Sequence, residues 1–373
     1  MIEIPAFANC HSHAFHRALR GREAGGDTFW GWRERMYAVA AALDPDLLRE
    51  LATATYLEMR LAGIDAVGEF HYLHHGPDGV PYADPNETGE ALIAAAREAG
   101  LRICLLDACY LRSGFEEPVA GVQRRFADAS AEAWATRVGA LAARHAGEDD
   151  VVVGAAIHSV RAVPVSDLAT IATALPDAPL HVHVSEQPAE NAACLAATGR
   201  TPVQLLAEAG VWSPRATAVH ATHLTDADVA TLGGAGVSVC FCPTTEAELA
   251  DGIGPSVALR DAGARLTLGS DSNTVIDLFA EARLVEMHER LRSGRRGAWR
   301  AEQLWRAATT DGLASLGFEP AQTIGLAESV RTAGATEPLW AASAADVRVP
   351  EVDPADVAAR LDKVVRAVWE AVA

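Results

Sequence analysis

The chain has 373 residues, with 31 Lys and Arg against 50 Asp and Glu side chains, which gives a formal net charge of −19. So acidic a protein lacks the positive field that nucleic acid or an anionic membrane surface requires, and neither is expected as a partner. Half of the residues are hydrophobic, yet no apolar run approaches the roughly 20 residues that cross a bilayer, and no secretory leader pattern is visible. The composition predicts a globular, cytoplasmic protein with a large core.

Short apolar runs alternate with helical patterns almost from the first residue. The candidate strands are residues 4–10, 66–70, 103–108, 151–157, 180–184, 216–219, 237–241 and 266–269. Helical periodicity falls between them, for example at 45–61, 87–99, 131–145, 226–233 and 278–292. Eight strands that are each followed by helix are typical of an α/β fold of the (β/α)₈ TIM-barrel type. A doubly wound open sheet is disfavoured, because no G-x-G-x-x-G turn follows any of these strands.

The end of the chain departs from this alternation. Residues 332–353 are rich in Ala, Pro and acidic side chains and have weak periodicity, and a helical pattern closes the chain at 354–372. We therefore expect residues 1–317 to form the barrel. Residues 318–373 are expected to form an irregular segment and a C-terminal helix that packs on it.

Lysine and cysteine usage excludes several kinds of site. Lys363 is the only lysine in the sequence and lies ten residues from its end. Chemistry that needs a lysine inside a site, such as a P-loop, a Schiff base or a carbamate that bridges two metals, is therefore not expected. The six cysteines contain no C-x-x-C pair and are predicted to be buried free thiols.

Histidines and one aspartate fall at the carboxyl ends of the predicted strands, where the active site of such a barrel forms. His11 and His13 follow the first strand two residues apart, so both side chains can face the barrel mouth. His183, His220 and Asp271 close or follow three later strands. Three imidazoles and a carboxylate with space for a water are the ligands of a catalytic Zn²⁺-type site, so the series predicts a divalent metal.

Six segments resemble the formimidoylglutamate deiminase family of the amidohydrolase superfamily. They are NCHSHAFHRA from residue 9, FWGWRE from 29, GEFHYLHH from 68, HSVRAV from 158, HVSEQ from 183 and CPTTE from 242. The superfamily pattern of an early His-x-His, a later His-x-x-Glu, a further His and a final Asp spans residues 3 to about 315. The resemblance implies a cytoplasmic hydrolase of histidine degradation, which converts N-formimidoyl-L-glutamate to N-formyl-L-glutamate and ammonia.

The resemblance also assigns the metal chemistry. It implies one divalent ion, expected to be Zn²⁺, held by His11, His13, His183 and Asp271, and the scarcity of lysine agrees with a single ion. His220 matches a catalytic histidine beside the metal-bound water rather than a ligand. Such a metal lowers the pKa of water towards about 7, so that Asp271 and His220 could accept its proton. Glu186 matches the proton shuttle that lets ammonia leave.

Substrate binding is expected to depend on arginines, because guanidinium matches carboxylate geometry best and the implied substrate carries two carboxylates. By resemblance, Arg33 and Arg161 bind these groups, while Tyr72 and His158 line the pocket. The expected partner is thus a small anionic substrate derived from an amino acid. Relatives tend to be dimers, and the sequence leaves a homodimer open.

Two positions depart from the family pattern. His16 stands where the family has a Gln that helps to hold substrate, and Asn273 stands where it has His. These changes leave open a different formimidoyl compound, or a cyclic amine or nucleobase, as the substrate, and a barrel without catalytic activity is the remaining alternative. Relatives also carry a small β-domain made from both chain ends. Because the barrel pattern begins within the first few residues, this domain is expected to be missing or vestigial.

Overall fold

Parallel strands follow one another around a barrel in the computed structural model, which describes residues 2–22, 29–320 and 322–373. Within these residues, eight strands hydrogen-bond side by side in chain order. They are β2 (Phe7–Ser12), β3 (Ile64–His71), β4 (Arg102–Cys109), β5 (Val151–Ile157), β6 (Leu180–Val184), β7 (Ala216–His220), β8 (Ser238–Phe241) and β9 (Arg265–Leu268). The circle returns to β2, because Ser12 bridges in parallel to Asp271 and the amide of Asp271 donates to the carbonyl of His11 at 2.9 Å. The predicted (β/α)₈ barrel is confirmed.

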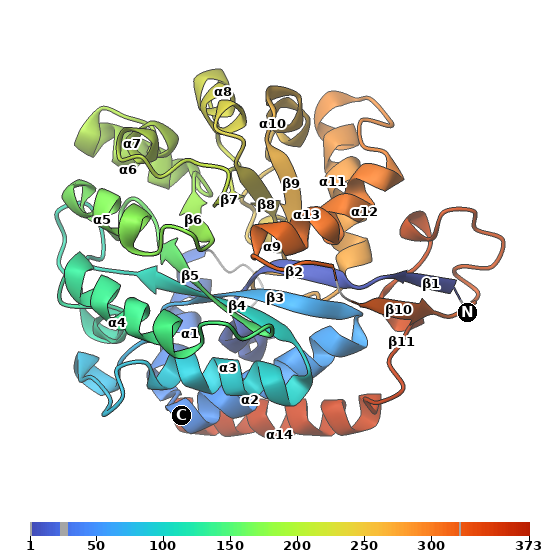
Figure 1. The fold of residues 1–373 in the computed structure, drawn as a ribbon, viewed down its shortest axis with the longest axis horizontal. Helices are drawn as coiled ribbons and strands as arrows, with labels where there is room; N and C mark the ends of the chain where they lie inside the picture. The colour runs from blue at the N-terminus through green and yellow to red at the C-terminus, as the bar shows by residue number, and fades with distance from the viewer. Residues whose placement is uncertain (1, 23–28, 321) are drawn as a thin grey trace.

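Helices surround these strands (Figure 1). Those of the first half are α1 (Phe29–Ala42), α2 (Pro45–Leu61), α3 (Glu87–Ala99), α4 (Ala131–Arg144), α5 (Leu168–Ala174), α6 (Pro188–Thr198) and α7 (Pro202–Glu208). Those of the second half are α8 (Asp226–Gly234), α9 (Pro243–Glu248), α10 (Ser256–Ala262), α11 (Leu278–Ser293), α12 (Ala301–Ala308), α13 (Thr310–Ser315) and α14 (Pro354–Val372). Local signals set their ends. The carboxylate of Asp44 caps α2 by accepting from the amide of Leu47 at 2.8 Å, and α3 ends at Gly100 with φ 73°.

The first predicted strand is divided in two. Strand β1 (Ile2–Pro5) belongs to a separate antiparallel sheet with β10 (Thr323–Leu326) and β11 (Val347–Arg348), in the order β1-β10-β11. The chain changes sheets at Ala6, whose amide donates to Gln322, whereas the amide of the next residue, Phe7, donates to Gly63 in the barrel. This small sheet joins the first residues of the chain to residues 323–348 (Figure 1), and its three short strands agree with the vestigial β-domain that was expected.

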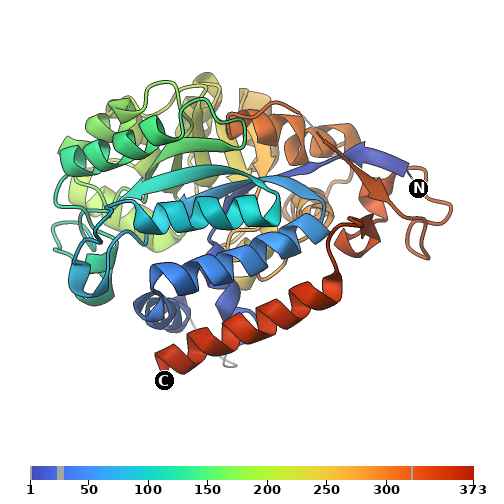
Figure 2. The same ribbon diagram turned by 60° about the horizontal axis from the view of Figure 1, so that its bottom comes forward.

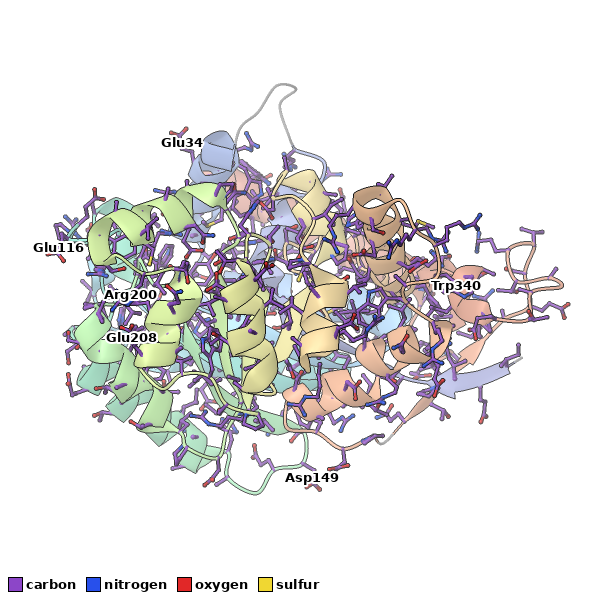
Figure 3. All side chains as sticks on the ribbon, turned by 90° about the horizontal axis from the view of Figure 1, so that it is seen from above. Glu34, Glu116, Asp149, Arg200, Glu208 and Trp340 are labelled. Atoms are coloured by element: carbon purple, nitrogen blue, oxygen red, sulfur yellow. The ribbon has the colours of Figure 1, made fainter. Side chains whose placement is uncertain are left out.

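The C-terminal helix α14 runs along α2 on the outside of the barrel (Figure 2). Its buried face is apolar, and the indole of Trp369 donates to the carbonyl of Ala18 at 2.9 Å. The segment between β10 and β11 contains the exposed side chain of Trp340. This segment and Glu116 lie towards opposite edges of the molecule (Figure 3). In the described parts of the chain, none of the helices has both the length and the apolar character to span a membrane.

Candidate active site

Four side chains converge at the carboxyl end of the barrel. His11 lies on β2, His13 directly after it, His183 on β6 and Asp271 after β9, and all four are buried. The Nε2 atoms of His11 and His183 are 3.0 Å apart. Oδ1 of Asp271 lies 3.5 Å from Nε2 of both His11 and His13. Side chains that are far apart in sequence therefore direct donor atoms at one point.

In two of these rings, those of His13 and His183, the other nitrogen shows that the donor set fits a metal ion. Nδ1 of His13 donates to the carbonyl of Phe70 at 2.9 Å, and Nδ1 of His183 donates to the carbonyl of His158 at 2.9 Å. With the ring proton on Nδ1, the Nε2 lone pairs are free to coordinate, as in carbonyl-supported histidine ligands. Burial lowers the pKa of both imidazoles, which keeps them in the neutral form that binds a cation.

His220, at the end of β7, lies beside this group. Its Nε2 is 3.9 Å from Oδ2 of Asp271 and 3.9 Å from Oε1 of Glu186. Burial alone would lower the pKa of His220, but the charges of Glu186 and Asp271 and the hydrogen bond to Glu246 outweigh it and raise the pKa. Burial raises the pKa of Glu186, which suits a carboxyl group that both takes up and releases a proton.

Two of these residues have strained backbones. His220 has φ 68° and Asp271 has φ 43°, a left-handed region that residues with a side chain rarely adopt. Each such residue costs of order 1–3 kcal/mol, and such conformations persist where surrounding structure enforces them. His220 ends β7 and Asp271 follows β9, and the two side chains approach each other to 3.9 Å.

These groups form one wall of a pocket that encloses about 620 Å³ of empty space, part of it open to solvent. That is an ordinary size for a small-molecule site. All but one of the site residues predicted from the sequence line it, namely His13, His16, Arg33, Tyr72, His158, Arg161, His183, Glu186, His220 and Asp271. The exception, His11, is fully buried and does not line the pocket.

The two residues that depart from the family pattern, His16 and Asn273, differ in whether they line the pocket. His16 lines the pocket, where its Nε2 hydrogen-bonds with the hydroxyl of Tyr72 at 2.9 Å and its ring lies 4.6 Å from that of His13. Asn273 does not line the pocket. Its side-chain amide donates to the carbonyl of His13 at 3.0 Å and to Oγ of Ser12 at 3.1 Å. Asn273 thus ties β2 to the segment after β9, next to the converging side chains.

Sequence reasoning missed several polar residues of the site. Oε1 of Glu246 lies 3.5 Å from Nδ1 of His220, although Glu246 ends one of the six resembling segments and could have been found there. Tyr37 and Tyr110 also line the pocket. Tyr37 comes from the helix α1 and Tyr110 directly follows β4, and no local pattern marks either of them.

A second group of metal-competent side chains, His71, His74 and Asp107, does not fit a metal. Arg137 donates to both oxygens of Asp107, at 2.7 and 2.9 Å, and the indole of Trp134 donates to the same carboxylate at 2.9 Å. A cation at this place would oppose the guanidinium charge. The group is a buried ion-pair network between β4 and α4.

A parallel barrel with imidazoles and a carboxylate converging at its mouth is the architecture of metal-dependent hydrolases, and the chain belongs to the amidohydrolase family, whose model matches residues 2–324. A formimidoylglutamate deiminase from Pseudomonas aeruginosa is 40% identical over 329 residues, which cover 84% of this chain and 72% of that protein. The resemblance found in the six segments is thereby confirmed. The family and this relative make the protein a hydrolase of C–N bonds.

Solved structures agree with this fold. An amidohydrolase from Brucella melitensis superposes with a TM-score of 0.90 at 31% identity, over 98% of this chain and 90% of that one. An adenosine deaminase from Xanthomonas campestris with bound zinc has a TM-score of 0.84 at 23% identity, over 99% of this chain and 86% of that one. The second likeness concerns the fold alone.

Proposed function

We propose that the protein hydrolyses N-formimidoyl-L-glutamate to N-formyl-L-glutamate and ammonia, a reaction of histidine degradation, with one Zn²⁺ ion. The observation that carries the proposal is a single pocket with metal-competent side chains at one wall and two arginines, Arg33 and Arg161, on its lining. The identity of 40% to the Pseudomonas aeruginosa formimidoylglutamate deiminase supports the same substrate.

His11, His13, His183 and Asp271 would hold the ion. When bound, a divalent ion at this place supplies Lewis acidity and lowers the pKa of water towards about 7. Nε2 of His220 and Oδ2 of Asp271 lie 3.9 Å apart, beside the place proposed for the ion. These two atoms would take up a proton as water attacks the formimidoyl carbon. Water adds to the C=N bond, and the C–N bond to the terminal nitrogen then breaks. Glu186 passes two protons in turn to that nitrogen, the one released as water attacks and the one released as the new hydroxyl becomes the formyl C=O, so that it leaves as ammonia.

The two arginines explain how a protein with a strongly negative net charge can bind a substrate that is itself negatively charged. A net charge of −19 would repel a dianion at long range, whereas guanidinium groups inside a pocket dominate the field there. Arg161 follows β5 on the same short segment as His158, and Arg33 lies on α1. The two charges therefore approach the substrate from different elements of the pocket lining and match its two carboxylates.

Release of ammonia from N-formimidoyl-L-glutamate by zinc-loaded protein tests the proposal. We expect turnover of this compound to exceed that of N-formimidoylglycine, adenosine, guanine and cytosine assayed in parallel. Faster turnover of one of the ring compounds would overturn the proposed substrate and favour a cyclic amine. No ammonia from any of them would favour a barrel without catalytic activity.

A further inference from the structure

Two tyrosine hydroxyls of the pocket share one hydrogen-bond donor. Nε2 of Gln123, on the 3₁₀ helix η3 (Gly121–Arg125), donates to Oη of Tyr37 at 3.1 Å and to Oη of Tyr110 at 3.0 Å. Gln123 is buried and does not line the pocket, whereas both tyrosines do. One amide group therefore holds two hydroxyls that come from separate elements of the chain.

The orientation of this amide is determined by its other end. Oε1 of Gln123 accepts from the backbone amide of Ala120 at 3.2 Å, so the NH₂ group must face the tyrosines. Each tyrosine oxygen is thus an acceptor towards Gln123, and its O–H hydrogen points elsewhere. Within the described residues neither hydroxyl has an acceptor for that hydrogen. Both O–H groups are free to donate to a ligand in the pocket.

The surroundings of the hydroxyls are positively charged. The guanidinium carbon of Arg33 lies 5.2 Å from the ring centre of Tyr37. Burial raises the pKa of Tyr110 to about 12 although the charges of Arg161 and Arg33 act in the opposite direction, so its hydroxyl keeps its proton near neutral pH. Two neutral donors beside two cations match the oxygens of a carboxylate.

Tyr110, which shares the amide of Gln123 with Tyr37, lies away from the metal-competent residues. The ring of His158 is 4.8 Å from that of Tyr110 and 5.4 Å from that of His183, so one imidazole separates Tyr110 from the converging ligands. A substrate whose formimidoyl carbon lies at the ligands would extend its far end towards this pair. In N-formimidoyl-L-glutamate that end is the side-chain carboxylate.

We propose that Tyr37 and Tyr110 donate hydrogen bonds to the side-chain carboxylate of the substrate, and that Gln123 is the positioning residue that turns both hydroxyls towards it. This inference rests on the proposed function for the identity of the substrate. It adds to that function a specificity determinant, because a substrate without the second carboxylate would leave two donors unpaired.

The test compares Tyr37→Phe, Tyr110→Phe and Gln123→Glu with Tyr82→Phe as the matched control. The hydroxyl of Tyr82 accepts from Arg125 and does not line the pocket. Each pocket Phe variant should raise KM for N-formimidoyl-L-glutamate about 10-fold, the effect of losing one hydrogen bond to a charged group, with little change in kcat. KM for N-formimidoyl-L-2-aminobutyrate, which lacks the second carboxylate, should not change.

The Gln123→Glu variant separates positioning from packing. A glutamate has nearly the same shape and can still accept from Ala120, but its second oxygen would draw both tyrosine hydrogens away from the pocket and add a negative charge. KM should therefore rise more than in either Phe variant while the melting temperature is retained. An unchanged KM in Gln123→Glu, or equal increases for both substrates in the Phe variants, would overturn the inference.

Calorimetry of glutarate binding to the zinc-loaded protein distinguishes two outcomes. In one the tyrosine subsite is wrong, and in the other the proposed substrate is wrong. Weaker glutarate binding in the Phe variants without turnover of N-formimidoyl-L-glutamate by the wild type would uphold the tyrosine subsite and refute the proposed substrate. Turnover by the wild type with unchanged KM and unchanged glutarate binding in the variants would refute the subsite alone.

Discussion

Glu246 contacts His220 on the side that faces away from Glu186 and Asp271. Its Oε1 lies 3.5 Å from Nδ1 of His220 and also accepts from the amide of Cys242 at 2.8 Å. Both side chains are buried. A carboxylate that accepts from Nδ1 keeps the ring proton there and leaves Nε2 directed at Glu186 and Asp271, the arrangement by which acid–imidazole pairs orient a general base.

Replacing this carboxylate should impair catalysis without loss of metal. In Glu246→Gln the neutral amide stabilises a protonated His220 less well, so we expect kcat to fall about 10-fold, at the lower end of what supporting residues of metal sites contribute. Steady-state ammonia release and metal analysis check the result. Glu208→Gln, in an exposed ion pair with Arg200 (Figure 3), is the control. A kcat equal to that of the control would contradict the orienting role.

The proton-shuttle role of Glu186 predicts a larger effect. Because a glutamine cannot transfer a proton to the leaving nitrogen, Glu186→Gln should lower kcat by about 10²- to 10⁴-fold, the usual contribution of general acid–base catalysis. The metal content should stay the same, since Glu186 lies outside the proposed ligand set. Single-turnover kinetics on metal-loaded protein measure the step directly. A near-normal rate would refute the shuttle.

Ligation by Asp271 predicts weaker metal binding when the carboxylate is removed. We expect Asp271→Ala to retain well under one equivalent of Zn²⁺ after gel filtration, because the cation loses its only anionic ligand. Elemental analysis gives the content. Asn273→Ala, which removes the support of the His13 carbonyl but no ligand, should lower zinc affinity by a smaller factor, about 10-fold. Full occupancy in Asp271→Ala would count against ligation.

The ion pairs of Arg137 predict a pH-dependent stability. Arg137 pairs with Asp107 and Asp128, at 2.7 and 2.8 Å. Burial would raise the pKa of Asp107, but the charge of Arg137 outweighs it and lowers the pKa to about 2, and the pKa of Asp128 is also lowered. A carboxylate with a lowered pKa stabilises the fold above its unfolded pKa of about 3.9, and this contribution disappears as the pH falls towards the folded value.

Arg137→Met should therefore cost about 3–5 kcal/mol of unfolding free energy at neutral pH, because two buried carboxylates lose their counter-ion. Without the guanidinium, burial raises the pKa of both carboxyl groups, so the folded variant takes up protons at a higher pH than the wild type does. The difference in unfolding free energy between the two proteins should therefore shrink as the pH falls. Urea unfolding at a series of pH values measures this. Arg366→Met removes an exposed pair with Asp362 and should cost less than about 1 kcal/mol. A deficit independent of pH would contradict the electrostatic explanation.

The sequence by itself determined the barrel and the metal-competent residues. Alternating apolar runs and helical periods are local properties, and several elements, such as α2 and α14, have the predicted bounds. Because the carboxyl ends of parallel strands meet at one mouth, placing His11, His183 and Asp271 at strand ends was enough to bring them together. The exchange of sheets at Ala6 was not visible, since its partner Gln322 lies at the other end of the chain.

Only the tertiary structure decided which polar residues support these metal-competent side chains and which line the pocket beyond them. Asn273 contacts His13 across 260 positions, and Gln123 joins Tyr37 to Tyr110 from a third segment. Such contacts depend on the closure of the barrel and on the packing of loops over it. Neither periodicity nor spacing along the chain encodes them, because both describe neighbours in sequence, whereas these hydrogen bonds join neighbours in space.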